Sequence, residues 1–118
     1  MRVLVCGGRE FHHWAPVVFA MKEFVGNFRG PNPGVTIIQG GAKGADFLGK
    51  VYADYVGWKC EEYPADWKTY GKRAGHIRNQ QMIDEGKPDL VIAFAGGTGT
   101  ADMVRRAKKH NIKVIEVK

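Results

Sequence analysis

This chain lacks serine, long apolar runs and closely spaced cysteines. No serine occurs among its 118 residues, which excludes a Ser-His-Asp hydrolase. The two cysteines, Cys6 and Cys60, are far apart and not in a Cys-x-x-Cys arrangement, so we expect buried free thiols rather than a disulfide framework or a zinc site. No run approaches the roughly 20 apolar residues of a membrane helix, and no signal peptide precedes the first glycines, so we expect a cytosolic protein with no membrane partner.

Two nucleotide-binding fingerprints are also absent. The chain has no Gly-x-Gly-x-x-Gly followed by an acidic residue at the distance needed to hold a ribose, and no phosphate loop ending in Gly-Lys-Ser/Thr. Hydride transfer and P-loop hydrolysis are therefore excluded, and no cofactor is expected. The adjacent His12 and His13 do not by themselves predict a metal site, and none is expected.

The net charge of +6 predicts anionic partners, without distinguishing small nucleotides from polymers. Much of the excess lies in one basic cluster, made of Arg105, Arg106, Lys108 and Lys109. We interpret this cluster as a solvated face that complements the C-terminal dipole of a helix. Nucleic acid is the less favoured partner because no recognised nucleic-acid motif accompanies the cluster. The sequence leaves homo-oligomerisation open.

The chain is long enough for one domain, residues 1–118, and too short for two. Runs of β-branched and apolar residues predict strands at residues 3–6, 35–39, 58–63, 89–94 and 113–117, the third of them at a sheet edge. Apolar residues at helical spacing predict helices at residues 17–28, 47–56, 72–85 and 100–110, and residues 30–34 resemble a linker. This alternation predicts a three-layer, Rossmann-like α/β domain with a five-stranded parallel sheet in the order 3-2-1-4-5 and helices on both faces.

Three glycine-rich turns follow predicted strands, at residues 7–9, 40–44 and 96–100. In an open α/β sheet, ligands lie at the carboxyl ends of the strands, where the winding direction reverses, here between the first and fourth strands. Unpaired amide N–H groups and the positive end of a helix dipole converge at such turns, which is how proteins hold phosphate or carboxylate. We therefore predict an anion site. The ligand-binding candidates in the turns are Gly7, Gly8, Arg9, Gly40, Gly41, Lys43, Gly44, Gly96, Gly97, Thr98, Gly99 and Thr100.

Several motifs together resemble a known family over essentially the whole chain. They are Val3-Leu4-Val5-Cys6-Gly7-Gly8-Arg9, Gly40-Gly41-Ala42-Lys43-Gly44-Ala45-Asp46, Pro64-Ala65-Asp66-Trp67, Gly71-Lys72 with Ala74-Gly75, Arg78-Asn79-x-x-Met82, and Ala93-Phe94-x-Gly96-Gly97-x-Gly99-Thr100-Ala101-Asp102-Met103. The set resembles the YspA group of the SLOG superfamily, which is named from the Smf/DprA DNA-processing proteins and the LOG phosphoribohydrolases. The resemblance implies a Rossmann-like fold that binds nucleotides or nucleotide-derived ligands; such proteins occur in bacteria and phages.

One departure from the LOG enzymes bears on chemistry. Their motif Pro-Gly-Gly-x-Gly-Thr-x-x-Glu ends in a glutamate that contributes to catalysis, whereas this chain has Ala95 at the proline and Met103 at the glutamate. A thioether is neither a base nor an anion, so LOG-type chemistry would need another carboxylate, from Asp46, Asp66 or Asp102. For Asp102, a ligand contact and simple stabilisation as an acid in the first turn of a helix are equally favoured. For Asp46, the matching family position favours a contact with a ribose hydroxyl.

Three further candidates, together with Arg9 and Lys43 from the turns, complete the predicted site. Arg78 is expected to grip phosphate, and Asn79 to contact a ribose or a backbone group. Arg9 and Lys43 lie on turns, where they either reach the anion or extend into solvent. Trp67 offers a flat surface for a base, or alternatively covers the core.

The sequence leaves three functions open. The first is a sensing or sequestering module that binds a mononucleotide or an ADP-ribose-like ligand. The second is an N-glycosidic hydrolase of the LOG type, with Asp46 or Asp102 as the catalytic candidate. The third is DprA-like binding of single-stranded DNA.

Overall fold

Five parallel strands form one sheet in the computed structural model, which describes residues 1–26 and 34–118. The strands are β1 (Arg2–Cys6), β2 (Thr36–Gln39), β3 (Lys59–Glu62), β4 (Leu90–Ala93) and β5 (Lys113–Glu116). Their order is β3-β2-β1-β4-β5, and every neighbouring pair is parallel. This confirms the predicted fold class and strand order, including the edge position of β3. The order reverses between β1 and β4, where Cys6 pairs with Ala93 at the carboxyl ends.

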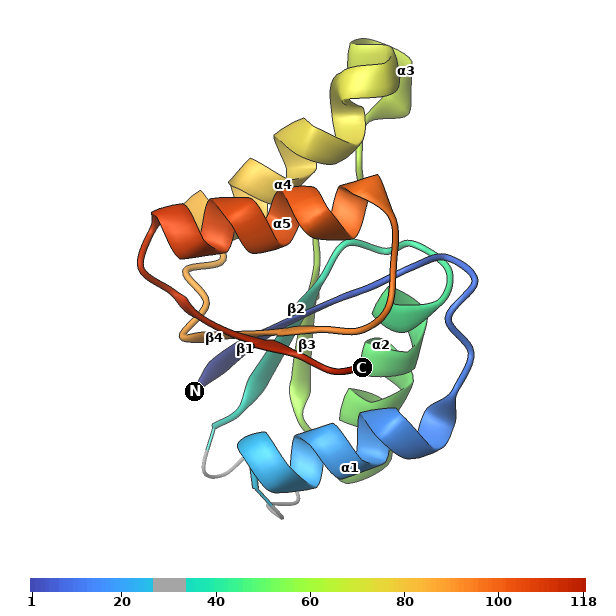
Figure 1. Cartoon of the computed structure of the whole chain (residues 1–118), viewed down its shortest axis with the longest axis vertical. Helices are drawn as coiled ribbons and strands as arrows, with labels where there is room; N and C mark the ends of the chain where they lie inside the picture. The colour runs from blue at the N-terminus through green and yellow to red at the C-terminus, as the bar shows by residue number, and fades with distance from the viewer. Residues whose placement is uncertain (27–33) are drawn as a thin grey trace.

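Helices cover both faces of the sheet (Figure 1). On one face lie α1 (Trp14–Phe24) and α2 (Ala45–Val56), and on the other lie α4 (Ala74–Asp84) and α5 (Thr98–Lys109). Successive side chains of β1 lie on opposite faces of the sheet. Val3 and Val5 pack toward α1 and α2, whereas Leu4 and Cys6 pack toward α4 and α5. The parallel strands are therefore buried on both sides, which explains their nearly continuous apolar sequence.

The helix boundaries differ from the sequence-based ones in several places. Helix α1 ends at Phe24, with Val25 as its C-cap, whereas Phe28 and most of the predicted linker lie outside the described residues. The third predicted helix is divided into the short 3-10 helix η1 (Gly71–Arg73) and α4, and it is preceded by the unpredicted α3 (Trp67–Tyr70). Helix α5 begins at Thr98, two residues earlier than expected, so the second half of the third glycine turn is its first turn.

Two further expectations concern the cysteines and the membrane. Both cysteines are free thiols, but only Cys6 is buried; Cys60, on edge strand β3, is half-buried, so its prediction as a core residue was wrong. No helix within residues 1–26 and 34–118 combines the length and the apolar character required to cross a bilayer.

Candidate anion-binding site

The three glycine turns meet around Gly8. The Gly8 N–H donates a hydrogen bond to the carbonyl oxygen of Ala95 (2.8 Å), and the Gly8 carbonyl accepts one from Ala45 N–H at the start of α2 (3.3 Å). A Cβ at Gly96 would lie 2.6 Å from the Gly8 nitrogen and would collide with Thr100 Oγ1. At Gly44, where φ is +79°, a Cβ would collide with the Gly8 carbonyl. The close approach of the three turns therefore requires glycine at these positions.

The turn at residues 40–44, which we name the closed turn, uses its own donors internally. The buried carboxylate of Asp46 accepts hydrogen bonds through Oδ2 from the N–H groups of Gly40 (3.1 Å) and Ala42 (3.4 Å). Gly41 N–H donates to Oε1 of Gln39, at 2.5 Å. Burial raises the pKa of Asp46, and the charge of Arg78 and the two backbone hydrogen bonds oppose that increase. The closed turn thus already holds a carboxylate that belongs to the chain itself.

The turn at residues 96–100, which we name the open turn, has its donors free. Gly97 is the N-cap of α5 and has no side chain to cap the helix, and the N–H groups of Thr98, Gly99 and Thr100 make no hydrogen bond with any described residue. Residues 96–99 are exposed, and a Cβ added at Gly97 or Gly99 would meet no atom within 4 Å. Three N–H groups at the positive end of the dipole of a 12-residue helix therefore have no partner among the described residues, in a turn that is largely exposed.

Positive side chains border this edge of the sheet. Arg9 follows Gly8, and its charge is near enough to Arg78 to contribute to the lowered pKa of that guanidinium, although burial is the larger cause. Arg78, on α4, donates from Nη1 to the carbonyl oxygen of Gly40 (2.6 Å) and from Nε to Asn79 Oδ1 (3.2 Å). Lys43 is exposed on the closed turn. None of these three cations has a salt bridge within the described part of the chain, although the nearby carboxylate of Asp46 attracts the charge of Arg78.

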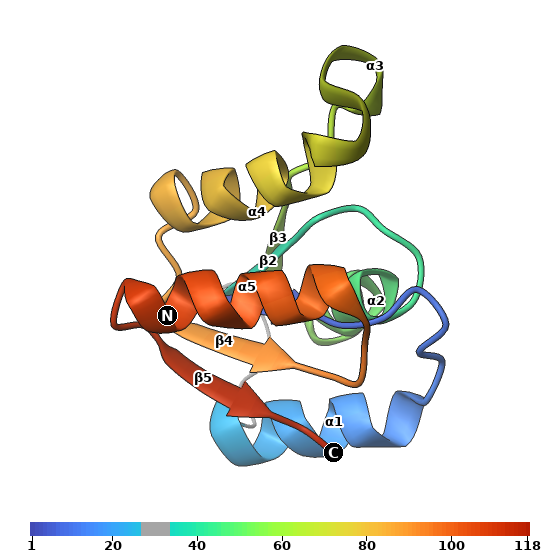
Figure 2. The same cartoon turned by 45° about the horizontal axis from the view of Figure 1, so that its top comes forward.

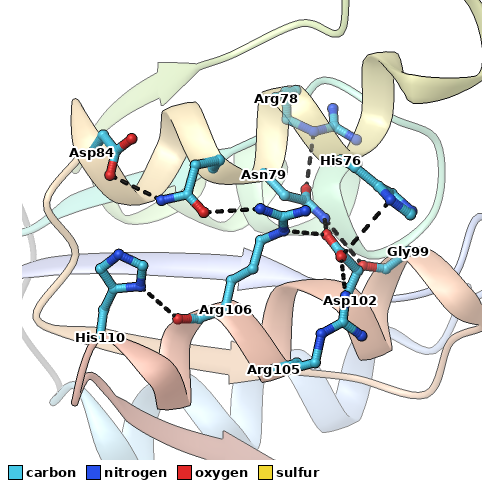
Figure 3. A network of polar contacts seen from close by, with 10 residues as sticks. His76, Arg78, Asn79, Asp84, Gly99, Asp102, Arg105, Arg106 and His110 are labelled. Carbon is cyan, nitrogen blue, oxygen red and sulfur yellow. Dashed lines mark hydrogen bonds and ion pairs between the residues drawn. The ribbon is translucent and has the colours of Figure 1, made fainter.

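A buried polar network lies beneath the open turn and joins α4 to α5 (Figure 3). Asn79 donates from Nδ2 both to the carbonyl oxygen of Gly99 (3.2 Å) and to Asp102 Oδ2 (3.1 Å). The carboxylate of Asp102 also accepts hydrogen bonds from Arg105 (2.6 Å) and Arg106 (2.8 Å). Burial alone would raise the pKa of Asp102, but the hydrogen bonds from Arg106 and Asn79 and the nearby positive charges lower it. Asn79 thus connects the first turn of α5 with Arg78 and, through it, with the closed turn.

This network corrects two interpretations of the sequence. Because α5 begins at Thr98, Asp102 lies beyond the first helical turn. The residue is only 1% exposed, and the hydrogen bonds from arginine and asparagine, rather than the helix dipole, stabilise its carboxylate there. The basic cluster is only partly a solvated face, since Arg106 also donates to Gln80 Oε1 on α4 (2.9 Å). Met103, at the LOG glutamate position, is fully buried against the sheet and does not line the open turn.

The predicted residues divide into two locations. The glycine turns, Arg9, Lys43, Asp46, Arg78 and Asn79 come together at the carboxyl edge of the sheet. Trp67 is the first residue of α3 and Asp66 is its N-cap, and α3 projects beyond the outer end of α4, away from the sheet (Figures 1 and 2). The carboxylate of Asp66 caps α3 by accepting a hydrogen bond from Thr69 N–H (3.0 Å), and the Trp67 side chain is half exposed beside Gly75.

Gln39 is a site residue that the sequence analysis missed. It is 1% exposed at the end of β2, where its side chain accepts from the closed turn and donates to Glu62 Oε1 at 3.0 Å. The signal was present in the sequence, because Gln39 ends a run of β-branched residues immediately before the glycines. Such a residue is buried only when hydrogen bonds satisfy it.

Comparison with known proteins agrees with this architecture. The model of the YspA, cpYpsA-related SLOG family matches residues 1–70. The chain is also 34% identical over 125 residues to the Gene 61 protein of Mycobacterium phage D29, in an alignment that covers 97% of this chain and 94% of that protein. The fold is Rossmann-like, and the candidate site lies at the switch between β1 and β4. The chain belongs to the YspA, cpYpsA-related SLOG family, and this membership indicates a function related to nucleotide binding.

Proposed function

We propose that this protein binds a phosphate-bearing nucleotide, such as a mononucleotide or ADP-ribose, and serves as a sensing or sequestering module. The phosphate lies on the open turn, where it accepts hydrogen bonds from the N–H groups of Thr98, Gly99 and Thr100. The observation that carries the proposal is the set of donors at the start of α5 that have no partner within residues 1–26 and 34–118, at the point where the strand order reverses.

Charge supports the same ligand class. Arg9 and Arg78 have no salt-bridge partner among the described residues. Asp46 already offsets part of the charge of Arg78, and a further anion that lies near both arginines relieves their mutual repulsion. Arg78 is held in place by Gly40 and Asn79, so a guanidinium at this edge is already oriented before a ligand arrives. A phosphate thus gains main-chain hydrogen bonds and charge neutralisation at one place.

The hydrogen bonds of the two candidate carboxylates favour binding without hydrolysis. Asp46 accepts the hydrogen bonds of the closed turn, and Asp102 accepts those of Asn79, Arg105 and Arg106. Each is therefore occupied by the chain's own groups, and Met103 replaces the LOG glutamate. An enzyme of the LOG type would release free base from AMP. We expect chromatography to show unchanged AMP after prolonged incubation, and free base accumulating with time would favour the hydrolase instead.

Thermal unfolding with and without ligand tests the proposal. A ligand present at about 100 times its dissociation constant adds about 2.7 kcal/mol, which raises the melting temperature by on the order of 10 °C in a domain of this size. AMP and ADP-ribose should raise it, whereas adenosine, which lacks phosphate, should not. The variant Arg78→Gln should weaken the response, with exposed Lys50→Gln as the matched control. If none of these ligands changes the melting temperature, the proposed function is wrong; a single-stranded oligonucleotide, run in parallel, tests the DNA-binding alternative.

A further inference from the structure

A groove continues from the open turn on the α1 side of the sheet. Its volume is about 720 Å³, within the range of small-molecule pockets. Gly96 and Gly97 belong both to the groove and to the open turn, and Arg9 also lines it. The remaining walls include Phe11 and His13, which precede α1, and Val117, which follows β5. Figure 2 shows the end of the chain after β5 lying close to α1.

The aromatic wall of the groove is fixed from behind by the core. The ring of Phe11 packs on the buried ring of Phe94, with ring centres 5.0 Å apart and planes inclined by 32°. His13 meets Phe11 edge to face, with ring centres 5.6 Å apart, and its side chain is exposed and makes no capping hydrogen bond to α1. A flat ligand group entering the groove would therefore meet a preformed aromatic surface instead of having to order one.

We propose that this groove holds the aromatic base of the nucleotide, with the base against Phe11 and His13 and the phosphate on the open turn. The inference rests on the proposed function, because the phosphate provides the anchor from which the groove continues. The charged residues that line the groove are Arg9, Glu10 and Lys118. Arg9 follows Gly8 at the border with the open turn and suits the anionic end of the ligand, while the apolar walls farther along suit a base. Base stacking on aromatic side chains needs no particular hydrogen-bond pattern.

This placement differs from the one that the sequence indicated. Trp67 was a candidate stacking surface, but α3 contacts α4 and η1, on the opposite face of the sheet from Phe11 and Phe94. The two placements lead to opposite expectations for variants at Trp67 and at His13. Both side chains are substantially exposed, so both can be changed without opening the core.

Calorimetric titration with AMP and with ribose 5-phosphate separates the base from the phosphate. The wild-type protein should bind AMP about tenfold more tightly than ribose 5-phosphate, as expected from stacking of one base. The variants His13→Ala and Phe11→Leu should each reduce that preference at least about threefold while leaving ribose 5-phosphate binding within about twofold of wild type. Trp67→Ala should bind both ligands as the wild type does.

Each contrary result has a distinct meaning. Equal binding of AMP and ribose 5-phosphate would overturn the base site while leaving the phosphate site intact. A loss of AMP binding in Trp67→Ala, with His13→Ala and Phe11→Leu unaffected, would place the base on the α3 side. Absence of binding by either ligand would overturn the proposed function together with this inference.

Discussion

The closed and open turns have similar sequences and opposite properties. Each is rich in glycine, follows a buried strand and leads into a 12-residue helix. In the closed turn, the N–H groups of Gly40 and Ala42 donate to Asp46, and that of Gly41 donates to Gln39. In the open turn, the first N–H groups of α5 have no partner among the described residues.

The two turns differ in how far along the following helix its aspartate lies. Asp46 is the second residue of α2 and bends back onto the turn before it, whereas Asp102 is the fifth residue of α5 and faces α4 instead. We therefore expect a glycine-rich turn before a helix to hold an external anion only when no side chain of the same chain already acts as the anion. The predictions below exchange or remove these carboxylates.

Removing the internal anion should have the largest effect. In Asp46→Ala, two N–H groups in the closed turn lose their acceptor, and stability should fall by about 2 kcal/mol because buried donors without partners are costly. Urea unfolding measures this loss. The matched control is Asp54→Ala, an exposed carboxylate on the same helix, which should change stability by no more than about 0.5 kcal/mol. Equal losses in the two variants would show that Asp46 does not support the closed turn.

Adding an internal anion to the open turn should abolish most ligand binding. In Gly97→Asp, the new carboxylate at the N-cap accepts from the first turn of α5 and repels phosphate, so AMP affinity should fall by about tenfold or more. Stability should change by only a few tenths of a kcal/mol, since Gly and Asp both serve as N-caps and the added atoms meet open space. Gly97→Asn is the neutral control of the same shape. AMP binding that is equally strong in the two variants would contradict the account.

Disconnecting the two turns should have a smaller effect. Asn79→Leu removes the hydrogen bonds to Gly99 and Asp102 and leaves Arg78 without its Asn79 partner. We expect a loss of stability of about 1 kcal/mol, because Arg105 and Arg106 still satisfy Asp102. Gln81→Leu, a neighbour on α4 outside the network, is the control. Calorimetry should also show weaker AMP binding in Asn79→Leu alone; identical affinity in both variants would indicate that Asn79 does not position the open turn.

The smallest effect distinguishes the two carboxylates by pH. The folded pKa of Asp46 lies above its unfolded value, so its contribution to stability is greatest at low pH and is lost as pH rises through the folded pKa. The folded pKa of Asp102 is lowered, so its contribution is present above the unfolded pKa and is lost as pH falls through the folded pKa.

Paired unfolding experiments between pH 3 and 7 measure these opposite signs, with ionisation of all other groups cancelling in the difference. As pH falls, the stability of the wild type relative to Asp46→Asn should increase, and its stability relative to Asp102→Asn should decrease. Changes of the same sign for both variants would mean that one of the two environments has been misassigned.

Much of the architecture could be predicted because it depends on local patterns. The β-branched runs of β1, β2 and β4 are continuous in sequence, and the chirality of parallel crossovers then restricts the strand order. The predicted helix boundaries were less accurate where the local helix propensity and the tertiary context disagree. Gly97 and Gly99 are poor helix formers, so the pattern placed the start of α5 after them, although the helix begins at Thr98. The four-residue α3 is too short to show a helical period.

The position of the candidate site could be predicted, but its detailed contacts could not. The carboxyl edge of the sheet and its three turns follow from topology alone, as does the nearness of Arg9 to Gly96. Which turn is already occupied depends on the direction taken by the side chain of Asp46, and a pattern of residue types does not encode that direction. The partners of Asp102 come from both α4 and α5, and their meeting depends on how the two helices pack. Such contacts form because buried polar groups need hydrogen-bond partners, and the spacing of residues along the chain does not reveal which partners they find.

Amide chemical shifts during titration with AMP test the central claim most directly. If the open turn holds phosphate, the amide signals of Thr98, Gly99 and Thr100 should move progressively with AMP concentration. Those of Gly40, Gly41 and Ala42, whose N–H groups already donate to Asp46 and Gln39, should move much less. Shifts concentrated in the closed turn, or no shift in either turn when AMP is present at millimolar concentration, would contradict the account.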